Sequence, residues 1–226
     1  MSTLYYCTVV YDRWQTFAHL LESFLQMVAQ PGHENVKLSV YDWNGAGKDI
    51  YPTWPASVIY TAGAERGPIN RSAARNRSLS ACQAVPEDLA FFVDCDMVLP
   101  LDFSERVCRC VKPGFAYFPV CYSLYRNAPM VVKGDGPPWL QGESSANGWW
   151  RESGRGNCGF TVADLMRVGG WDAERWGTGY GREDDDVFWR AVNTLAVHRE
   201  RVPGFFHQWH PKKPEQQNPQ LRRGNK

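Results

Sequence analysis

The chain has 226 residues, of which 43% are hydrophobic and 22% are charged, and its formal net charge is +1. These values are ordinary for a globular protein, and we expect residues 1–226 to form a single domain around one core. A net charge this close to zero does not by itself indicate a nucleic-acid-binding protein. Because no apolar run reaches the roughly 18 residues that span a bilayer, the composition also excludes a membrane-spanning helix.

The N-terminus and the cysteines bear on the cellular compartment. Residues 1–14, MSTLYYCTVVYDRW, lack the basic and apolar segments of a signal peptide and are more typical of a first strand. The seven cysteines are odd in number and follow no regular spacing. We therefore expect reduced thiols, a cytoplasmic location and no membrane partner.

Strands and helices alternate in the first 100 residues. Strands are predicted at 4–11, 36–43, 56–63 and 89–96, and helices are predicted at 14–30 and 70–84. The last of these strands is almost continuously apolar, so we place it near the centre of a sheet. This order predicts an α/β fold with a mostly parallel central sheet and helices on both faces. In such sheets ligands bind beyond the carboxyl ends of the strands, which is where Asp94 and Asp96 lie.

The second half of the chain is less regular. A helix is expected at 102–111 and a strand at 114–122, and a long stretch rich in Gly, Pro and Trp follows. An irregular stretch of this length usually serves a function or is mobile. Residues 158–172 are predicted to form a strand and a short helix, and a further helix begins near Glu183. The chain ends in a basic tail, 211–226, which suits contact with a polyanion.

Asp94 and Asp96 indicate a bound cation, since residues two apart on an extended chain point to the same side. Two carboxylates held side by side repel each other, and a divalent cation between them would relieve that repulsion. Such a cation, with open coordination positions, can hold phosphate oxygens. The competing interpretation is structural, with one of the two aspartates capping a following helix.

Four acidic residues, EDDD at 183–186, stand in a row at the expected start of a helix. The helix dipole stabilises anions there by a few tenths to about 1 kcal/mol each, but capping needs only one or two of them. Some should therefore face sugar hydroxyls or a substrate proton. Because Gly177, Gly179 and Gly181 permit loop motion, we expect a lid that ends in carboxylates.

His207 and His210 lie three residues apart among aromatic residues. On a strand this spacing would place them on opposite sides, so they can share a metal only if the segment turns or is irregular. Imidazole ligands added to carboxylate oxygens would favour Mn²⁺ over Mg²⁺. The alternative is that both histidines are surface or packing residues.

Six segments, in order along the chain, resemble one group of enzymes. They are INRSAARN (69–76), FFVDCDMVLP (91–100), NCGFTVADLMRVGGWD (157–172), GYGREDDDVFWR (179–190), FFHQWH (205–210) and KKPEQQNPQ (212–220). Together they resemble the inverting β-1,4-galactosyltransferases and the chondroitin N-acetylgalactosaminyltransferases, which are metal-dependent glycosyltransferases of the GT-A fold. The resemblance implies a nucleotide-sugar-binding half at 1–100 and a loop-rich acceptor-binding and catalytic half at 101–210.

By position, the resemblance assigns the metal ligands and the donor site. The implied ligands of Mn²⁺ (or Mg²⁺) are Asp94, Asp96, His207 and His210, and Asp94 is also placed near the donor ribose. The implied contacts to the UDP-sugar are Arg13, Ile69, Arg71, Asp94, Tyr180 and Glu183. Two of these depart from the family pattern, because Ile69 is not aromatic and Tyr180 replaces a tryptophan.

The resemblance also assigns the catalytic base and the acceptor side. Asp184 matches the general base, which takes the proton of the attacking hydroxyl as the anomeric carbon inverts. The implied acceptor contacts are Trp150, Trp176, Gly181 and Asp185. Arg182 stands where the family has glycine, and the donor sugar, the linkage and the oligomeric state stay open.

The acceptor hydroxyl is predicted from basic and aromatic residues. The family also resembles short soluble glycosyltransferases, some of them viral, that modify hydroxymethylated pyrimidines in DNA. The residues that would suit a phosphate backbone and a flipped base are the basic tail, Arg66, Arg71, Arg75, Arg77, Trp139, Trp149 and Trp150. We therefore expect 5-hydroxymethylcytosine in DNA as the acceptor. The alternatives are a glycan or lipid-linked sugar acceptor and, from another class, a non-catalytic nucleotide-sugar-binding domain.

Overall fold

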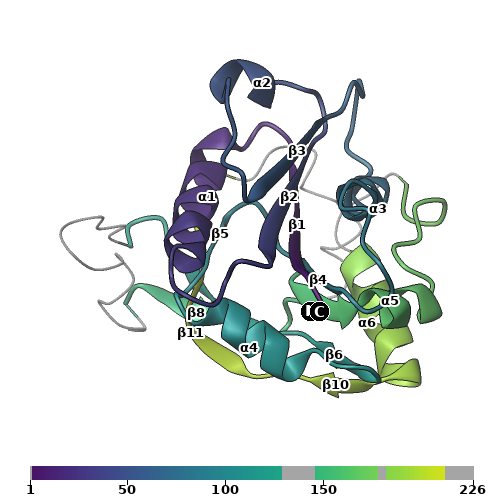
Figure 1. Cartoon of the computed structure of the whole chain (residues 1–226). Helices are drawn as coiled ribbons and strands as arrows, with labels where there is room; N and C mark the ends of the chain where they lie inside the picture. The colour runs from purple at the N-terminus through teal and green to yellow at the C-terminus, as the bar shows by residue number, and fades with distance from the viewer. Residues whose placement is uncertain (1, 129–145, 178–181, 212–226) are drawn as a thin grey trace, which may run out of the picture.

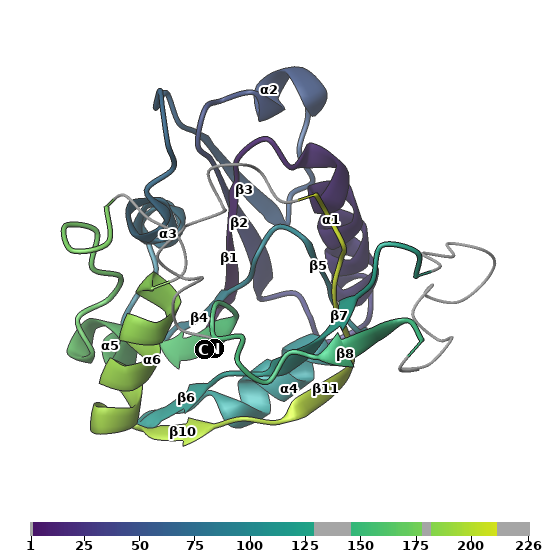
Figure 2. The ribbon, with the colours of Figure 1, turned by 180° about the vertical axis from the view of Figure 1, so that it is seen from behind.

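The computed structural model describes residues 2–128, 146–177 and 182–211, which form two sheets. Within these residues a seven-stranded sheet has the order β10-β6-β9-β4-β1-β2-β3, and a four-stranded sheet has the order β5-β11-β7-β8 (Figure 2). The large sheet comprises β1 (Leu4–Val10), β2 (Val36–Asp42), β3 (Val58–Ala62), β4 (Leu89–Phe92), β6 (Phe115–Tyr117), β9 (Cys158–Thr161) and β10 (Ala196–His198). The small sheet comprises β5 (Met97–Val98), β7 (Val120–Leu124), β8 (Gly148–Trp150) and β11 (Arg201–His207).

The large sheet is mostly parallel, as the alternation of elements predicts. Strands β4, β1, β2 and β3 run parallel to one another, whereas β9 is antiparallel to both of its neighbours, β4 and β6. The predicted central position of the fourth strand is confirmed. Because parallel neighbours end at the same edge, Arg13, after β1, and Asp94, after β4, emerge close together.

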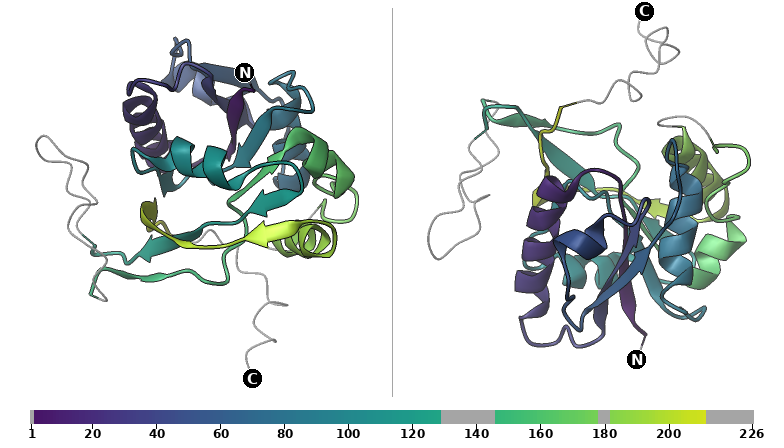
Figure 3. Two further views of the ribbon diagram at one scale, coloured as in Figure 1. Left: turned by 60° about the horizontal axis from the view of Figure 1, so that its bottom comes forward. Right: turned by 90° about the horizontal axis from the view of Figure 1, so that it is seen from above.

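Helices cover both faces of the large sheet, which confirms the predicted layering. They are α1 (Trp14–Val28), α2 (Gly47–Ile50), α3 (Arg71–Ser80), α4 (Phe103–Cys110), α5 (Val162–Arg167) and α6 (Glu183–Thr194). Figure 1, and the view from above in Figure 3, show α1 on one side of the strands and α3, α5 and α6 on the other.

Strand β1 joins the two layers of the core through its alternating side chains. Tyr6 and Val10 pack on the side of α1, where Phe17 and Phe24 are fully buried. Cys7 points the other way, into the cluster that includes residues of α5 and α6. One apolar strand therefore anchors both helical layers.

Helix α3 lies close against the sheet because it buries mainly small side chains, among them Ala74 and Ser78. The Asn70 side-chain oxygen accepts a hydrogen bond from the Ala73 N–H at 2.9 Å, and this cap fixes the start of the helix. The Ser39 hydroxyl on β2 donates to the Ser78 carbonyl at 2.6 Å. These contacts fix the position of α3, and with it the arginines Arg71, Arg75 and Arg77, against the large sheet.

The structure divides the predicted strand 114–122 into two strands of different sheets. β6 ends at Tyr117 and β7 begins at Val120, with Pro119 between them. Proline has no N–H to continue a ladder, so the chain leaves the large sheet there. Strand β11 has no counterpart in the predictions, because Pro203 and Gly204 interrupt its apolar pattern. The small elements α2, β5, β8 and β10 also have no counterpart.

The longest helix among the described residues, α1, has 15 residues. None of the described helices combines the length and the hydrophobicity needed to cross a membrane. The lid residues 178–181 and all but the first residue of the predicted basic tail lie outside the described residues.

We expect Phe24→Ala to lower the free energy of unfolding by about 3–5 kcal/mol, because it removes a buried ring and leaves a cavity. The ring centroid of Phe24 lies 5.8 Å from that of Tyr6 in the core between α1 and β1. Urea denaturation measures the change, with exposed Val85→Ala as the matched control, expected within about 0.5 kcal/mol of the wild type. A loss below about 1 kcal/mol for Phe24→Ala would contradict the described core.

Candidate active site

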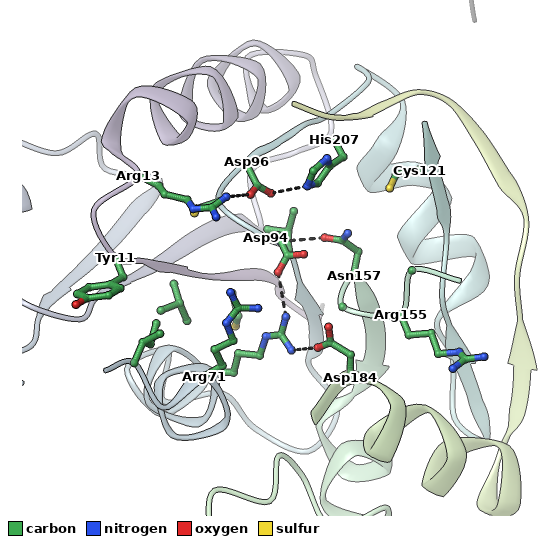
Figure 4. A pocket seen from close by; sticks show the side chains of 18 of the residues that line it. Tyr11, Arg13, Arg71, Asp94, Asp96, Cys121, Arg155, Asn157, Asp184 and His207 are labelled. Atoms are coloured by element: carbon green, nitrogen blue, oxygen red, sulfur yellow. Dashed lines mark hydrogen bonds and ion pairs between the residues drawn. The ribbon is translucent and has the colours of Figure 1, made fainter. Parts of the chain in front are cut away.

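Segments from both halves of the chain surround one cavity at the carboxyl edge of β1 and β4 (Figure 4). Its volume is about 540 Å³. The residues of the sequence-based assignments that line it are Arg13, Ile69, Arg71, Arg75, Asp94, Asp96, Asp184, Asp185 and His207. The fold thus brings together side chains that are far apart along the chain.

Asp96, His207 and His210 form a cluster with the composition of a transition-metal site. One ligand atom of each residue lies within 4.8 Å of the others. His210 Nε2 is 3.1 Å from Asp96 Oδ2, and His207 Nε2 is 3.7 Å from Asp96 Oδ1. This Oδ1 atom is buried and accepts no hydrogen bond within the described part of the chain. A buried carboxylate that has an imidazole near each oxygen, and one oxygen without a hydrogen-bond donor, fits a divalent cation of the Mn²⁺ type.

The two histidines face the same carboxylate because β11 ends at His207 and residues 208–210 are irregular. Gln208 holds this irregular segment in place: its N–H donates to the Asp96 carbonyl at 2.8 Å, and its side-chain amide donates to the Thr16 carbonyl at 3.0 Å. The irregular segment satisfies the condition under which residues three apart can share a metal. No motif marks Gln208 in the sequence, although it lies between the two histidines.

The electrostatics of the cluster favour the protonation states that bind cations. Burial opposes ionisation of Asp96, but His207, His210 and Arg13 outweigh it and hold the pKa of Asp96 well below its ordinary value. The Arg13 guanidinium donates to Asp96 Oδ2 at 2.6 Å. Burial lowers the pKa of His207 by more than the Asp96 carboxylate raises it, so this ring loses its proton more readily than an exposed imidazole. An ionised carboxylate and a neutral imidazole are the forms that ligate a metal.

Ser123 orients the His207 ring. Its hydroxyl oxygen lies 3.1 Å from His207 Nδ1, and this contact leaves Nε2 directed toward Asp96. The pairing of β7 with β11 places Ser123 directly beside His207. Hydrogen-bond partners of this kind fix the orientation of metal-binding histidines. The sequence around Ser123 contains no signal for this role.

Arg75 joins Asp94 to Asp184 beneath the cavity. Its Nη2 atom donates to Asp94 Oδ1 at 3.0 Å, and its Nη1 atom donates to Asp184 Oδ1. The guanidinium also lies 4.1 Å above the Trp171 ring. Burial lowers the pKa of Arg75, but the two carboxylates outweigh burial and raise it above its ordinary value. The arginine therefore stays charged and fixes both carboxylates.

Asp94 and Asp96 consequently do not form the side-by-side pair that the alternation argument predicts. Strand β4 ends at Phe92, and both aspartates lie in the connection to β5 rather than on the strand. The Asp94 N–H donates to Asn157 Oδ1 at 2.9 Å, and its carboxylate faces Arg75 instead of the two histidines. Within the described residues, the cluster formed with His207 and His210 thus contains Asp96 without Asp94.

Each acidic residue of the EDDD segment, 183–186, forms an ion pair with an arginine. The ion pairs are Glu183–Arg71 (3.7 Å), Asp184–Arg75, Asp185–Arg155 and Asp186–Arg190 (2.7 Å). Glu183 is the most buried of the four, and its pKa is raised first by burial and then by Asp184. Arginines of α3, α6 and the segment before β9 therefore offset the repulsion among the four acids. The expected contacts of some of these acids with sugar hydroxyls or a substrate proton stay predictions.

The remaining residues predicted to contact the donor or the acceptor either lie away from the cavity or fall outside the described residues. Trp150 packs its ring 5.4 Å from that of Tyr122, and Trp176 lies under the Arg175 guanidinium at 4.9 Å. Neither tryptophan is among the residues that line the cavity. Tyr180, Gly181 and Trp139 lie outside the described residues. The lining also includes residues that the sequence analysis did not single out, among them Tyr11, Cys121, Arg151, Arg155, Gly156 and Asn157.

Residues 10–223 match the family described as chondroitin N-acetylgalactosaminyltransferase. The chain belongs to this family. Membership confirms the resemblance carried by the six sequence segments and places the chain among the glycosyltransferases.

The family's animal members match part of the chain at moderate identity. Mouse chondroitin sulfate N-acetylgalactosaminyltransferase 2 is 34% identical over 131 residues, which cover 56% of this chain and 24% of the mouse protein. Human chondroitin sulfate N-acetylgalactosaminyltransferase 1 is 29% identical over 130 residues, which cover 55% of this chain and 24% of the human protein. The matched segment therefore spans about a quarter of the length of these relatives.

Solved structures show the same fold at lower identity. The crystal structure of S. aureus TarS 1–349 in complex with UDP has a TM-score of 0.62 and 13% identity, covering 92% of this chain and 61% of that one. The complex of the same protein with UDP-GlcNAc also has a TM-score of 0.62, and it covers 96% of this chain. The similarity is one of fold, and it confirms the GT-A architecture.

We expect the purified protein to bind one Mn²⁺ ion at the Asp96 cluster and His210→Ala to weaken this binding by about 10-fold or more, because the variant loses a ligand. Loss of the free Mn²⁺ signal in electron paramagnetic resonance measures the affinity.

The matched control is His198→Ala. His198 belongs to the other group of closely spaced ligand atoms found in the described residues, with Cys110 and Glu200. Its removal should leave Mn²⁺ affinity at the Asp96 cluster unchanged. Equal affinity in the wild type and His210→Ala would contradict the assignment of the cluster.

Proposed function

We propose that this protein is a metal-dependent inverting glycosyltransferase that moves a sugar from a UDP-sugar to a hydroxyl of a glycan. The observation that carries the proposal is a single cavity region with two features, the Asp96–His207–His210 cluster and a separate carboxylate, Asp184. Direct displacement needs charge stabilisation at the leaving group and a base at the attacking hydroxyl. Family membership and the UDP and UDP-GlcNAc complexes of TarS support a nucleotide-sugar donor.

On the donor side, Ile69 and Arg71 line the cavity, and Ile69 belongs to the same small apolar cluster as Tyr11. We assign the apolar Ile69 side chain to the uracil and the Arg71 guanidinium to the diphosphate. Asp94, which lines the same cavity, is assigned to the ribose hydroxyls. A divalent cation held by Asp96 and the two histidines would neutralise the charge that grows on the diphosphate as UDP leaves.

On the acceptor side, Asp184 is the proposed general base. Arg75 binds its Oδ1 atom, which leaves Oδ2 to accept the proton of the attacking hydroxyl. Gly156 lies beside this oxygen, and a Cβ atom there would come within 2.9 Å of Asp184 Oδ2. Glycine at this position therefore preserves space next to the base. Contacts of the acceptor with Asp185, Trp176 and Gly181 stay predictions.

A glycan acceptor is better supported than a modified DNA base. Relatives described as N-acetylgalactosaminyltransferases support a glycan acceptor and N-acetylgalactosamine as the first donor sugar to test. The comparisons give no support to 5-hydroxymethylcytosine as the acceptor. Two of the arginines expected to contact DNA have carboxylate partners: Arg75 pairs with Asp184, and Arg77 pairs with Glu65. The cytoplasmic location stays a prediction.

A UDP-release assay with Mn²⁺ tests the proposed function. We expect turnover of UDP-N-acetylgalactosamine or a related UDP-sugar with chondroitin oligosaccharides, and none when Mn²⁺ is removed by a chelator. Transfer only to DNA that contains 5-hydroxymethylcytosine would restore the first acceptor prediction. Binding of UDP-sugars without turnover on any acceptor, or on water, would indicate the non-catalytic alternative.

We expect Asp184→Asn to lower kcat by about 10²-fold or more while the Kd of the UDP-sugar stays close to the wild-type value. The amide retains the shape of the side chain but cannot take a proton. Initial-rate kinetics and isothermal titration calorimetry measure the two quantities.

Asp49→Asn, at an exposed aspartate on α2, is the matched control and should behave like the wild type. Near-normal turnover in Asp184→Asn would remove Asp184 from the role of base.

A further inference from the structure

One face of the small sheet extends from the cavity to the surface. Strand β7 lies between β11 and β8, and its Ser123 is paired with His207 on one side and with Trp149 on the other. Residues directly opposite each other on neighbouring strands project to the same face. Trp149 therefore shares a face with the proposed metal ligand His207, two strand spacings or about 10 Å away along the backbone.

The same face forms part of the cavity wall. Cys121 and Arg151 stand two residues from Ser123 and Trp149, so they project to the same side. Both line the cavity, and the Arg151 N–H donates to the Cys121 carbonyl at 2.9 Å. A two-residue step along a strand is about 6.6 Å, so Trp149 lies immediately beside the wall.

Two aromatic rings are exposed on this face. Trp149 is 47% exposed and Tyr125 is 44% exposed, and their ring centroids lie 5.4 Å apart with a tilt of 32°. We call this pair the aromatic shelf. Trp150, the next residue, projects to the opposite face, where it packs with Tyr122 and Phe206. The structure therefore places Trp149, rather than Trp150, on the side of the cavity.

We propose that the aromatic shelf binds sugar rings of the acceptor glycan beyond the ring that receives the transferred sugar. This inference rests on the proposed function. Flat apolar rings with one face open to water suit the C–H faces of pyranose rings, whose hydroxyls can stay solvated. We favour an acceptor glycan as the occupant because this sheet face is continuous with the cavity wall. A glycan whose end lies in the cavity would extend over Trp149 and Tyr125.

The shelf acts on affinity for long acceptors and leaves the chemical step unchanged. The KM for a chondroitin hexasaccharide should rise about 3- to 10-fold in Trp149→Ala, a change of the size expected for one lost aromatic contact. The kcat, the KM of the UDP-sugar and the KM of a monosaccharide glycoside acceptor should stay within about 2-fold of the wild type. Trp149→Phe should recover part of the lost affinity, and Tyr125→Ala should show a smaller effect in the same direction.

Phe115→Ala is the matched control, since Phe115 is an aromatic residue of β6 that is 39% exposed and does not line the cavity. An unchanged hexasaccharide KM in Trp149→Ala would overturn the proposal. An equal rise for monosaccharide and hexasaccharide, or a rise in the KM of the UDP-sugar, would also overturn it and would indicate a structural role for Trp149.

Direct binding separates this proposal from the proposed function. Calorimetric titration of the hexasaccharide into wild type, Trp149→Ala and Phe115→Ala, without donor, should show weakened binding in Trp149→Ala alone. That result would support the shelf even if no UDP-sugar were turned over. Absence of hexasaccharide binding by an enzyme that turns over UDP-sugar with a short acceptor would reject the shelf and leave the proposed function standing.

Discussion

Burial of the Asp96 carboxylate is the constraint on which the rest of the site depends. An anion removed from water is costly unless cationic or hydrogen-bonding groups surround it. Here Arg13, His207 and His210 approach the same carboxylate, while one of its oxygens accepts no hydrogen bond within the described ranges. These contacts tie the end of β1, the turn after β4 and the end of β11 to one point. The need to compensate the buried charge of Asp96 therefore explains how these three segments fold together. It also explains why the site suits a cation.

Arginine–carboxylate ion pairs join the two halves of the chain. Arg71 and Arg75 on α3 pair with Glu183 and Asp184 in the first turn of α6. Helix α3 is itself fixed by its asparagine cap and by its small buried residues, so the position of the proposed base follows from packing on the donor side. Loss of either arginine would leave carboxylates near the cavity without their partners, which links catalysis to the stability of the α3–α6 contact.

The fold and several site residues follow from local patterns in the sequence, and the rest depends on tertiary contacts. The early strands and helices have clear periodicity, and the prediction that the histidines can share a ligand only across a turn or an irregular segment is met by the irregular residues 208–210. The predicted strand 114–122 is divided at Pro119, where the chain passes from the large sheet to the small one. Proline marks this point because it has no N–H for a strand ladder, but the presence of a second sheet depends on tertiary contacts. The pairing of the EDDD acids with arginines, and the opposite faces of Trp149 and Trp150, depend on helix placement and strand register. Neither is readable from residue types alone.

The most direct measurement of the central claim is anomalous scattering from crystals soaked with Mn²⁺ and UDP. The account predicts one strong manganese peak within bonding distance of an Asp96 oxygen and of Nε2 of His207 and His210, with diphosphate oxygens completing the coordination. A cavity that contains UDP with no manganese at these three residues would contradict it, as would manganese bound elsewhere in the cavity.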